Sequence, residues 1–453
     1  MTISKNVDMI NGSLTKNIIK FCIPVILTNF LQLIFNAADL VIVGQYCGEN
    51  YVGAVGATLS VIHLIIGLFT GLSVGVGVAV AQGLGAQDDK FVSDTVHTSV
   101  LSFFIVGVIL TGVGIVLTPS LLTWMNTPKD ILPLAITYMQ IYFAGSVVIL
   151  LYNCGASILR AAGDSRSPLI YLFLAGVLNV GLNIFFVTRL EMDVDGVAWA
   201  STISQAFSCI LVLFTIARRT DSCKLRFRKL RIKSKPLAEV ARIGLPAGIQ
   251  GTLFSISNVI IQSSINGFGE LAVAGNSAAI SIEDFSLMSM DGVNQAAVNF
   301  SGQNFGAKKF NRIRKLTIIC LVAVSVVGVV TGGAVFAFAK PLLSIFVPES
   351  QEAIDFGYTR LTYLCLPYFV WGLMMVMTGV IRGLGASFVP MLISVLGICG
   401  FRLVYLFTVF QIPKFHTPEA LFFSYPVSWA ITLVTLIIAY KILYKKLMKK
   451  NIN

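Results

Sequence analysis

The chain has 453 residues, of which 56% are hydrophobic and only 12% are charged, and its formal net charge is +12. Soluble domains carry about 25% charged residues, and disordered chains are poor in apolar ones, so both classes are excluded. The eight cysteines occur singly, without a CxxC pair, which excludes a disulfide scaffold and gives no sign of a zinc ribbon. The composition therefore predicts a polytopic membrane protein.

Long apolar runs predict twelve membrane-spanning helices, because one span needs about 20 apolar residues. Unlike the strands of a membrane barrel, these runs do not alternate apolar and polar residues. The N-terminus lacks the organisation of a cleavable signal peptide, so we expect it to be retained. The predicted spans are 15–43, 53–81, 95–117, 133–157, 167–188, 195–217, 242–266, 272–301, 315–339, 357–380, 388–410 and 419–441.

The first span carries a polar stripe of Asn29, Gln32, Asn36 and Asp39, which fall within an arc of about 80° on a helix. A charge in hydrocarbon costs about 2.5–3.5 kcal/mol on insertion scales, so an acid in a span indicates function. Low dielectric disfavours the charged form of a carboxylate, which makes Asp39 the first candidate for binding and releasing a coupling proton. The alternative is that Asp39 ends the helix near the outer surface and is merely solvated.

The fifth span adds two amides to this candidate site. Asn179 and Asn183 are four residues apart and share one helix face. Together with Asn36 they are predicted to complete a hydrogen-bonded cluster around Asp39. The same oxygen atoms suit a sodium ion as well as a proton relay, so the pattern leaves the coupling ion open.

Lysine and arginine predict the orientation of the chain. With the N-terminus inside, most of the 33 basic residues fall in inside segments, above all in the linker 218–241. This bias places both termini in the cytoplasm. It also explains the positive net charge without nucleic acid, because a positive-inside loop near anionic lipid accounts for 218–235 better than an RNA-binding tail does. The basic residues left outside are Lys129, Arg189, Lys340, Arg360 and Lys414.

The seventh span repeats the polar stripe of the first without its acid. The position that matches Asp39 is Ile261. The two halves are thus chemically unequal, and the N-terminal half is the better candidate for ion coupling. The stripe of the seventh span is Ser255, Asn258, Gln262 and Asn266.

The eighth span carries three acids, Glu283, Asp284 and Asp291. Three acids facing lipid would be prohibitive, so we expect them to line a wet cavity that attracts a cationic substrate. The alternative is that Arg402, which lies inside a span, pairs with one of them as a buried structural bridge. The predicted substrate cavity contains Glu283, Asp284, Asp291, Gln32, Asn258, Gln262, Asn294 and Gln295.

The chain repeats itself at a spacing of about half its length. Pro24 matches Pro246, and Asn36 matches Asn258. LRAAGDSRSP (159–168) matches IRGLGASFVP (381–390) in the same way. Because each half has an even number of spans, both enter the membrane from one side, and the pseudo-two-fold axis lies along the membrane normal. The predicted fold is an all-α membrane protein of two six-helix bundles, 1–217 and 242–453, joined by the cytoplasmic linker 218–241.

The sequence contains no HExxH, GxSxG or Walker motif, and its three histidines are scattered. An enzyme is therefore not predicted, and neither is a cofactor. Because no ATP-binding motif is present, the energy for transport must come from an ion gradient.

Several of these segments together resemble the multidrug and toxic compound extrusion (MATE) transporters, whose superfamily includes polysaccharide and lipid flippases. The resemblance covers about 15–445. It rests on the stretch from Pro24 to Asp39, the span ends GLGA and GQNFGA, the two matched segments above, LNVGLNIFFV, and DGVAWASTISQ.

The resemblance implies two six-helix bundles in a V shape and efflux of organic cations driven by inward flow of protons or sodium. It also implies that Asp39 is a coupling residue. Two departures are visible. Members of one branch often carry an acid in span five where this chain has Asn183, and another branch uses an acid early in span seven where this chain has Gln250.

The sequence thus predicts a multi-pass, monomeric antiporter of the cell membrane that exports amphipathic, cationic organic compounds by alternating access. A flippase for a lipid-linked or anionic substrate is the alternative. It would need basic residues in the cavity, and Arg402 is the single candidate.

Overall fold

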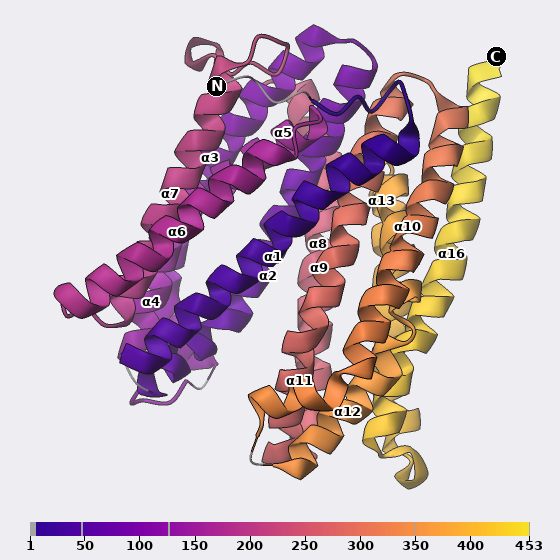
Figure 1. Cartoon of the computed structure of the whole chain (residues 1–453). Coiled ribbons are helices and arrows are strands. Elements are labelled where there is room, and N and C mark those ends of the chain that lie inside the picture. Colours follow the sequence, from indigo (N-terminus) through magenta and orange to yellow (C-terminus); the bar gives the residue numbers. More distant parts are fainter. Residues whose placement is uncertain (1–5, 47–48, 126, 349, 453) are drawn as a thin grey trace. The chain divides into compact units, whose positions relative to one another are not determined.

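The structure is a computed structural model that describes residues 6–46, 49–125, 127–348 and 350–452. These described residues form helices and connecting turns, with no strand (Figure 1). The α-helices are α1 (Leu14–Tyr46), α2 (Glu49–Gly85), α3 (Asp89–Trp124), α4 (Leu132–Ala144), α5 (Ser146–Ala161), α6 (Arg166–Arg189), α7 (Val194–Arg218), α8 (Ser234–Asn266), α9 (Glu270–Gly306), α10 (Phe310–Ala337), α11 (Ala339–Phe346), α12 (Gln351–Cys365), α13 (Tyr368–Gly383), α14 (Phe388–Ser394), α15 (Phe401–Phe407) and α16 (Pro418–Ile452). The π-helical turn η2 (Val395–Gly400) joins α14 to α15, and the 3₁₀ turns are η1 (Phe227–Lys229), η3 (Val409–Gln411) and η4 (Pro413–Phe415).

The number of apolar helices agrees with the predicted spans. Within the described part of the chain, nine helical segments are long and apolar enough to cross a membrane, and there are up to 11 when each of two bent pairs counts as one span. The remaining long helix is α9, which carries the acids Glu283, Asp284 and Asp291. Its polar face explains why it falls short on hydropathy although its length, 37 residues, is more than sufficient.

Two predicted spans, 133–157 and 357–380, are bent pairs of helices. α4 and α5 meet at 45° around Gly145, and α12 and α13 meet at 50°. The second bend has a local cause, because Pro367 has no amide hydrogen to donate and its ring crowds the preceding turn of helix. At the first bend, the amide of Gly145 still bonds to the carbonyl oxygens of Ile141 and Tyr142.

The chain divides into two compact units. The N-terminal unit contains Leu27–Leu245, with Val7 of the preceding stretch, and the C-terminal unit contains Asp8–Ile26 and the chain from Pro246 onward. The divisions fall inside α1 and α8, close to the matched prolines Pro24 and Pro246. Each unit therefore includes the first turns of a helix whose remainder belongs to the other unit.

Hydrogen bonds explain why residues 8–26 belong to the C-terminal unit. The Asn304 side-chain amide donates to the Met9 carbonyl oxygen at 2.9 Å, and Lys309 Nζ donates to Asn11 Oδ1 at 2.9 Å. Arg312 donates to the carbonyl oxygens of Asn11 and Gly12 at 2.9 and 3.0 Å.

The basic linker 218–241 belongs to the N-terminal unit for a similar reason. The Arg226 amide donates to His97 Nε2 at 3.0 Å, the Lys233 amide donates to Thr98 Oγ1 at 3.2 Å, and Lys233 Nζ pairs with Asp94 at 2.5 Å. The linker is thus fastened to the first turns of α3.

The start of the linker is also held by an ion pair. Arg219 bonds both carboxylate oxygens of Asp221. Burial raises the pKa of Asp221, but the hydrogen bonds and charge of Arg219 outweigh it and hold that pKa below its ordinary value. The linker therefore begins with a charged, locally ordered turn.

Within each unit, glycines allow the backbones of neighbouring helices to come into close contact. In the N-terminal unit, a Cβ on Gly75 of α2 would lie 2.4 Å from the carbonyl oxygen of Val240 on α8. In the C-terminal unit, a Cβ on Gly275 of α9 would lie 2.1 Å from the carbonyl oxygen of Ala353 on α12. Small residues at such points are typical of helix packing in membranes.

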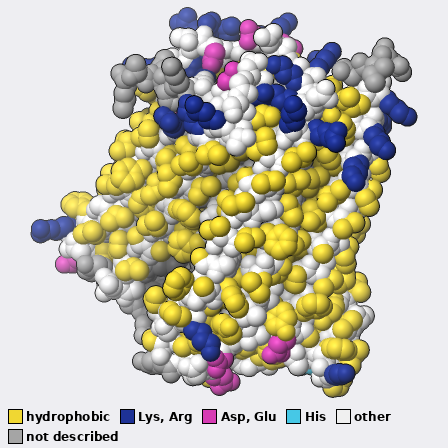
Figure 2. Space-filling model, turned by 45° about the vertical axis from the view of Figure 1, so that its right-hand side comes forward, with side chains coloured by type: hydrophobic (Ala, Val, Ile, Leu, Met, Phe, Trp, Pro, Cys, Tyr) yellow, Lys and Arg dark blue, Asp and Glu magenta, His cyan; other side chains and the backbone are white. Residues whose placement is uncertain are grey.

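Hydrophobic side chains cover much of the molecular surface. On the face in Figure 2 they form a broad yellow area, and charged side chains lie at its margins. Many large apolar residues are exposed, among them Val116, Ile210, Val330 and Val404. A soluble protein rarely exposes apolar area on this scale, whereas contact with lipid tails accounts for it.

Candidate ion and substrate sites

A carboxylate cluster lies inside the N-terminal unit, where α1, α6 and α7 meet. The Asn183 side-chain amide donates to Asp39 Oδ1 at 2.6 Å, and Ser201 Oγ donates to Asp39 Oδ2 at 3.0 Å. Asn179 Nδ2 donates to Ser201 Oγ at 3.1 Å. Both oxygens of the Asp39 carboxylate are therefore held by neutral donors from two neighbouring helices.

The cluster is enclosed by protein. Asn179 and Asn183 are buried, and Asp39 is partly buried. Asn183 Nδ2 also donates to Asn179 Oδ1 at 3.3 Å, which ties the two amides on α6 together. Asn183 Oδ1 is buried without a hydrogen-bond partner among the described residues. The site thus offers a carboxylate and an unoccupied amide oxygen side by side, which suits a cation.

The structure brings together most of the residues predicted for this site. Asn179 and Asn183 lie at Asp39, whereas Asn36 is exposed and makes no hydrogen bond to it. Because α1 continues to Tyr46, Asp39 does not end the helix. Ser201 was not singled out from the sequence. It lies in the segment DGVAWASTISQ, but a lone serine in a span carries no signal of its own.

The acids of α9 are not equivalent. Glu283 forms a bidentate ion pair with Arg360 of α12, in which Arg360 Nε and Nη2 donate to Oε1 and Oε2 at 2.8 Å each. Glu283 is 3% exposed and Arg360 is 6% exposed. Arg360 also donates to Asn276 Oδ1 at 2.9 Å, and Asn276 donates to Gln262 at 2.9 Å. The charge of Glu283 is therefore neutralised within the C-terminal unit.

Arg360 had been expected outside the membrane, and Arg402 was the candidate partner for an acid. Arg402 instead donates to Ser428 Oγ at 3.0 Å and stacks over the ring of Tyr425, with Cζ 3.8 Å from its centroid. It forms no salt bridge among the described residues. Nothing in the sequence indicated that Arg360 pairs with Glu283, because Arg360 lies near the end of a predicted span.

The two other predicted acids and Asn258 are more accessible than Glu283. Asp284 and Asp291 are partly exposed, and Asp291 accepts hydrogen bonds from Asn294 at 3.1 Å and Gln295 at 3.5 Å. Asn258 is exposed. Asp284 and Asp291 are thus more exposed than Glu283.

Two glutamines considered in the sequence analysis, Gln32 and Gln250, lie in different surroundings. Gln32 on α1 is exposed, on the part of the helix that belongs to the N-terminal unit. Gln250, where another branch of the resembling family has an acid, accepts a hydrogen bond from Arg382 Nη2 at 2.7 Å. Gln250 is therefore engaged by a neighbouring cation.

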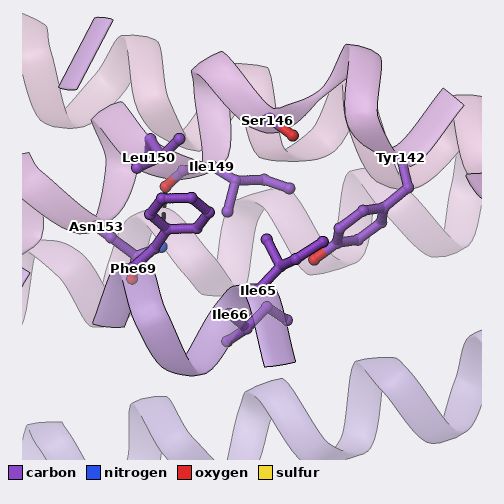
Figure 3. A pocket seen from close by; sticks show the side chains of 8 residues that line it. All are labelled: Ile65, Ile66, Phe69, Tyr142, Ser146, Ile149, Leu150 and Asn153. Carbon is purple, nitrogen blue, oxygen red and sulfur yellow. Dashed lines mark hydrogen bonds between the residues drawn. The ribbon is translucent and has the colours of Figure 1, made fainter. Parts of the chain in front are cut away.

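The N-terminal unit also contains a small pocket of about 20 Å³ beside the bend between α4 and α5 (Figure 3). Its walls come from α2, α4 and α5 and are mainly apolar, and it has room for about one water molecule. It was not predicted from the sequence. It is lined by Ile65, Ile66, Phe69, Tyr142, Ser146, Ile149, Leu150 and Asn153.

Groups of three or more His, Cys, Asp or Glu side chains that could hold a metal ion are absent from the described residues. An alkali cation needs only oxygen ligands, which the Asp39 cluster provides.

Comparison with known proteins agrees with the helical architecture. The chain is 24% identical over 433 residues to a probable multidrug resistance protein, YoeA, of Bacillus subtilis strain 168, covering 94% of this chain and 93% of that protein. It is 27% identical over 396 residues to the probable multidrug resistance protein NorM of Thermotoga maritima, covering 86% of this chain and 84% of that protein. In fold, it matches an outward-facing multidrug resistance MATE family transporter of the MOP superfamily, with a TM-score of 0.89, 22% identity and coverage of 99% and 100%.

Apolar spans, two compact units and a carboxylate enclosed within a span define a helical membrane transporter rather than an enzyme. Residues 24–185 and 246–408 match the family MatE, one match in each half of the sequence. The chain belongs to the MatE family, and the resemblance noted from its motifs is confirmed.

Proposed function

We propose that the protein is a secondary active antiporter that exports amphipathic, cationic organic compounds in exchange for protons or sodium ions. The family assignment supports transport of organic compounds across a membrane, and two relatives are named as probable multidrug resistance proteins. The coupling ion, the charge of the substrate and the antiport cycle are the parts that we add.

The Asp39 cluster is the observation that carries the proposal. Its carboxylate accepts hydrogen bonds from Asn183 and Ser201, and it has no cationic partner among the described residues. Such a carboxylate alternates readily between an ionised state and a state neutralised by a cation. A proton on Asp39 or a sodium ion beside it would also satisfy the free oxygen of Asn183.

We assign binding of the substrate's positive charge to Asp284 and Asp291. Glu283 does not bind the positive charge of the substrate in this proposal, because Arg360 already neutralises it. We place the protein in the cell membrane as a monomer, with both termini in the cytoplasm, in accord with the positive-inside rule.

Transport in reconstituted liposomes tests this proposal. A fluorescent organic cation is followed while a proton gradient and a sodium gradient are imposed separately. We expect uphill movement of the dye with one gradient and not with the other, which names the ion. Absence of movement with either gradient would contradict the antiport proposal, and lipid-linked substrates would then test the flippase alternative.

A further inference from the structure

Arg402 of α15 is a buried cation without a counter-charge among the described residues. It is 5% exposed, and its hydrogen bond to Ser428 uses only Nε. Nη2 is buried without a hydrogen-bond partner in the described part of the chain. A buried charge is costly unless it is paired and hydrogen-bonded, so this arrangement needs an explanation.

The acid paired with the neighbouring Arg360 is not available to Arg402. Glu283 is held by both arms of Arg360, and Arg360 is itself a cation. Both guanidinium groups lie near the ring of Tyr425, with Cζ of Arg402 at 3.8 Å and Cζ of Arg360 at 5.6 Å from its centroid. Cation–π contact offsets part of the cost of burial but supplies no hydrogen-bond acceptor. The neighbourhood therefore keeps one uncompensated positive charge.

Further unpaired donors lie in the same place. The Arg402 guanidinium is 5.9 Å from the ring of Trp429, and the rings of Trp429 and Trp371 are 5.6 Å apart. The indole N–H groups of both tryptophans are buried without a partner among the described residues. An indole N–H can only donate, as can a guanidinium. Three unpaired donors and a positive charge thus gather in one aromatic cluster.

The backbone holds Arg402 in this position. The π-helical turn η2 directly precedes α15, and such turns occur often at functional sites. A Cβ on Gly397 of this turn would lie 2.3 Å from Thr432 Oγ1, so the turn runs against α16. Because α16 carries Tyr425, Ser428 and Trp429, the close approach sets Arg402 against that helix face.

We propose that Arg402, Trp371 and Trp429 form a binding site for a monovalent anion inside the C-terminal unit. The ligand is a halide ion or a carboxylate group, because either supplies acceptors for a guanidinium and for indole N–H groups. This site uses none of the acids of α9, and its existence does not depend on the proposed antiport.

Tryptophan fluorescence tests the site without any transport assay. Replacing the exposed Trp124 and Trp199 by phenylalanine leaves Trp371 and Trp429 as the reporters. Iodide, which quenches indole on contact, is titrated at constant ionic strength. We expect saturable quenching that chloride or benzoate reverses by competition. Competition by chloride identifies a free-anion site, and competition by benzoate alone identifies a site for a carboxylate group.

Variants of Arg402 test whether the iodide quenching depends on its guanidinium group. Arg402→Gln should raise the half-saturating iodide concentration by about tenfold or more, and Arg402→Lys by less. Arg314→Gln, at an exposed position of α10, is the matched control and should leave it unchanged. Quenching that is linear in iodide and insensitive to both competitors would overturn the proposal. That competition test uses the protein with Arg402 intact, so it remains decisive if Arg402→Gln does not fold.

Discussion

The acids Asp39 and Glu283 have opposite surroundings. Asp39 accepts hydrogen bonds from neutral side chains, whereas Glu283 is matched by both arms of Arg360. A carboxylate among neutral donors can exchange a bound cation, but a carboxylate in a bidentate ion pair has its charge already satisfied. Chemistry at the residue scale thus supports the coupling role proposed for Asp39 and indicates a structural role for Glu283.

Glu283→Gln tests that structural role. Removing one partner of a buried ion pair leaves the other charge uncompensated, which costs about 3–5 kcal/mol. We expect a clearly lower unfolding temperature in detergent, measured by intrinsic fluorescence. Asp284→Asn, the next residue on the same helix, is the matched control and should unfold close to the wild type. Equal unfolding temperatures for both variants would rule out a stabilising pair.

Part of each site could be predicted from the sequence, for a physical reason. Acids and amides are rare in spans, so Asp39, Asn179 and Asn183 stand out, and their helical spacing places the two amides on one face. Ser201 does not stand out, because serine is tolerated in spans through bonds to its own helix. Arg360 was missed because it lies near a predicted span end, where an arginine is usually solvated.

At the scale of helices, hydrophobic periodicity predicts neither the bends within spans nor the close contacts between helices. The predicted spans 133–157 and 357–380 each contain a bend, and only the second has a proline at the break. Hydropathy reports that a segment is apolar, not whether it is straight. Contacts between helices depend on single glycines, which the sequence displays without indicating which ones touch a neighbour.

The adjacent glycines of α10 allow a controlled test of helix packing. A Cβ on Gly332 would lie 2.3 Å from the carbonyl oxygen of Cys365 at the end of α12, whereas a Cβ on Gly333 would meet nothing within 4 Å. Overpacking of this kind costs about 1–3 kcal/mol. Gly332→Ala should therefore lower the unfolding temperature and Gly333→Ala should not. The same shift in both variants would show that α10 and α12 do not touch there.

The linker contact at His97 makes a prediction about proteolysis. His97→Ala removes the acceptor of the Arg226 amide, and a hydrogen bond of this kind contributes about 0.5–1.5 kcal/mol. Local opening of the linker becomes more frequent, so trypsin should cleave within 218–241 several-fold faster. His416→Ala, in the C-terminal unit, should leave the rate unchanged. An unaltered rate in His97→Ala would mean that this bond does not restrain the linker.

At the scale of the whole molecule, the internal repeat predicted two helical halves, and each half contains its own match to the family. The predicted division at the linker differs in detail from the compact units, because residues 8–26 bond to the C-terminal unit and the linker bonds to the N-terminal unit. The unit to which each of these segments belongs depends on individual hydrogen bonds between residues far apart in the sequence. Repeat spacing carries no information about them.

Orientation in the membrane can be tested on intact cells. In a background without cysteine, Arg228→Cys in the linker and Lys414→Cys in the loop before α16 are both exposed positions. The positive-inside rule predicts that an impermeant maleimide labels Lys414→Cys from outside and labels Arg228→Cys only after the membrane is opened. The reverse pattern would invert the proposed topology.

The central claim is that Asp39 couples ion flow to export, and the most direct test is Asp39→Asn in proteoliposomes. The amide keeps the size of the side chain but cannot exchange a charge. We expect a folded protein that still exchanges the dye down its own gradient but has lost gradient-driven accumulation, whereas Asp130→Asn, in an exposed loop, behaves as the wild type. Full uphill transport by Asp39→Asn would contradict the account.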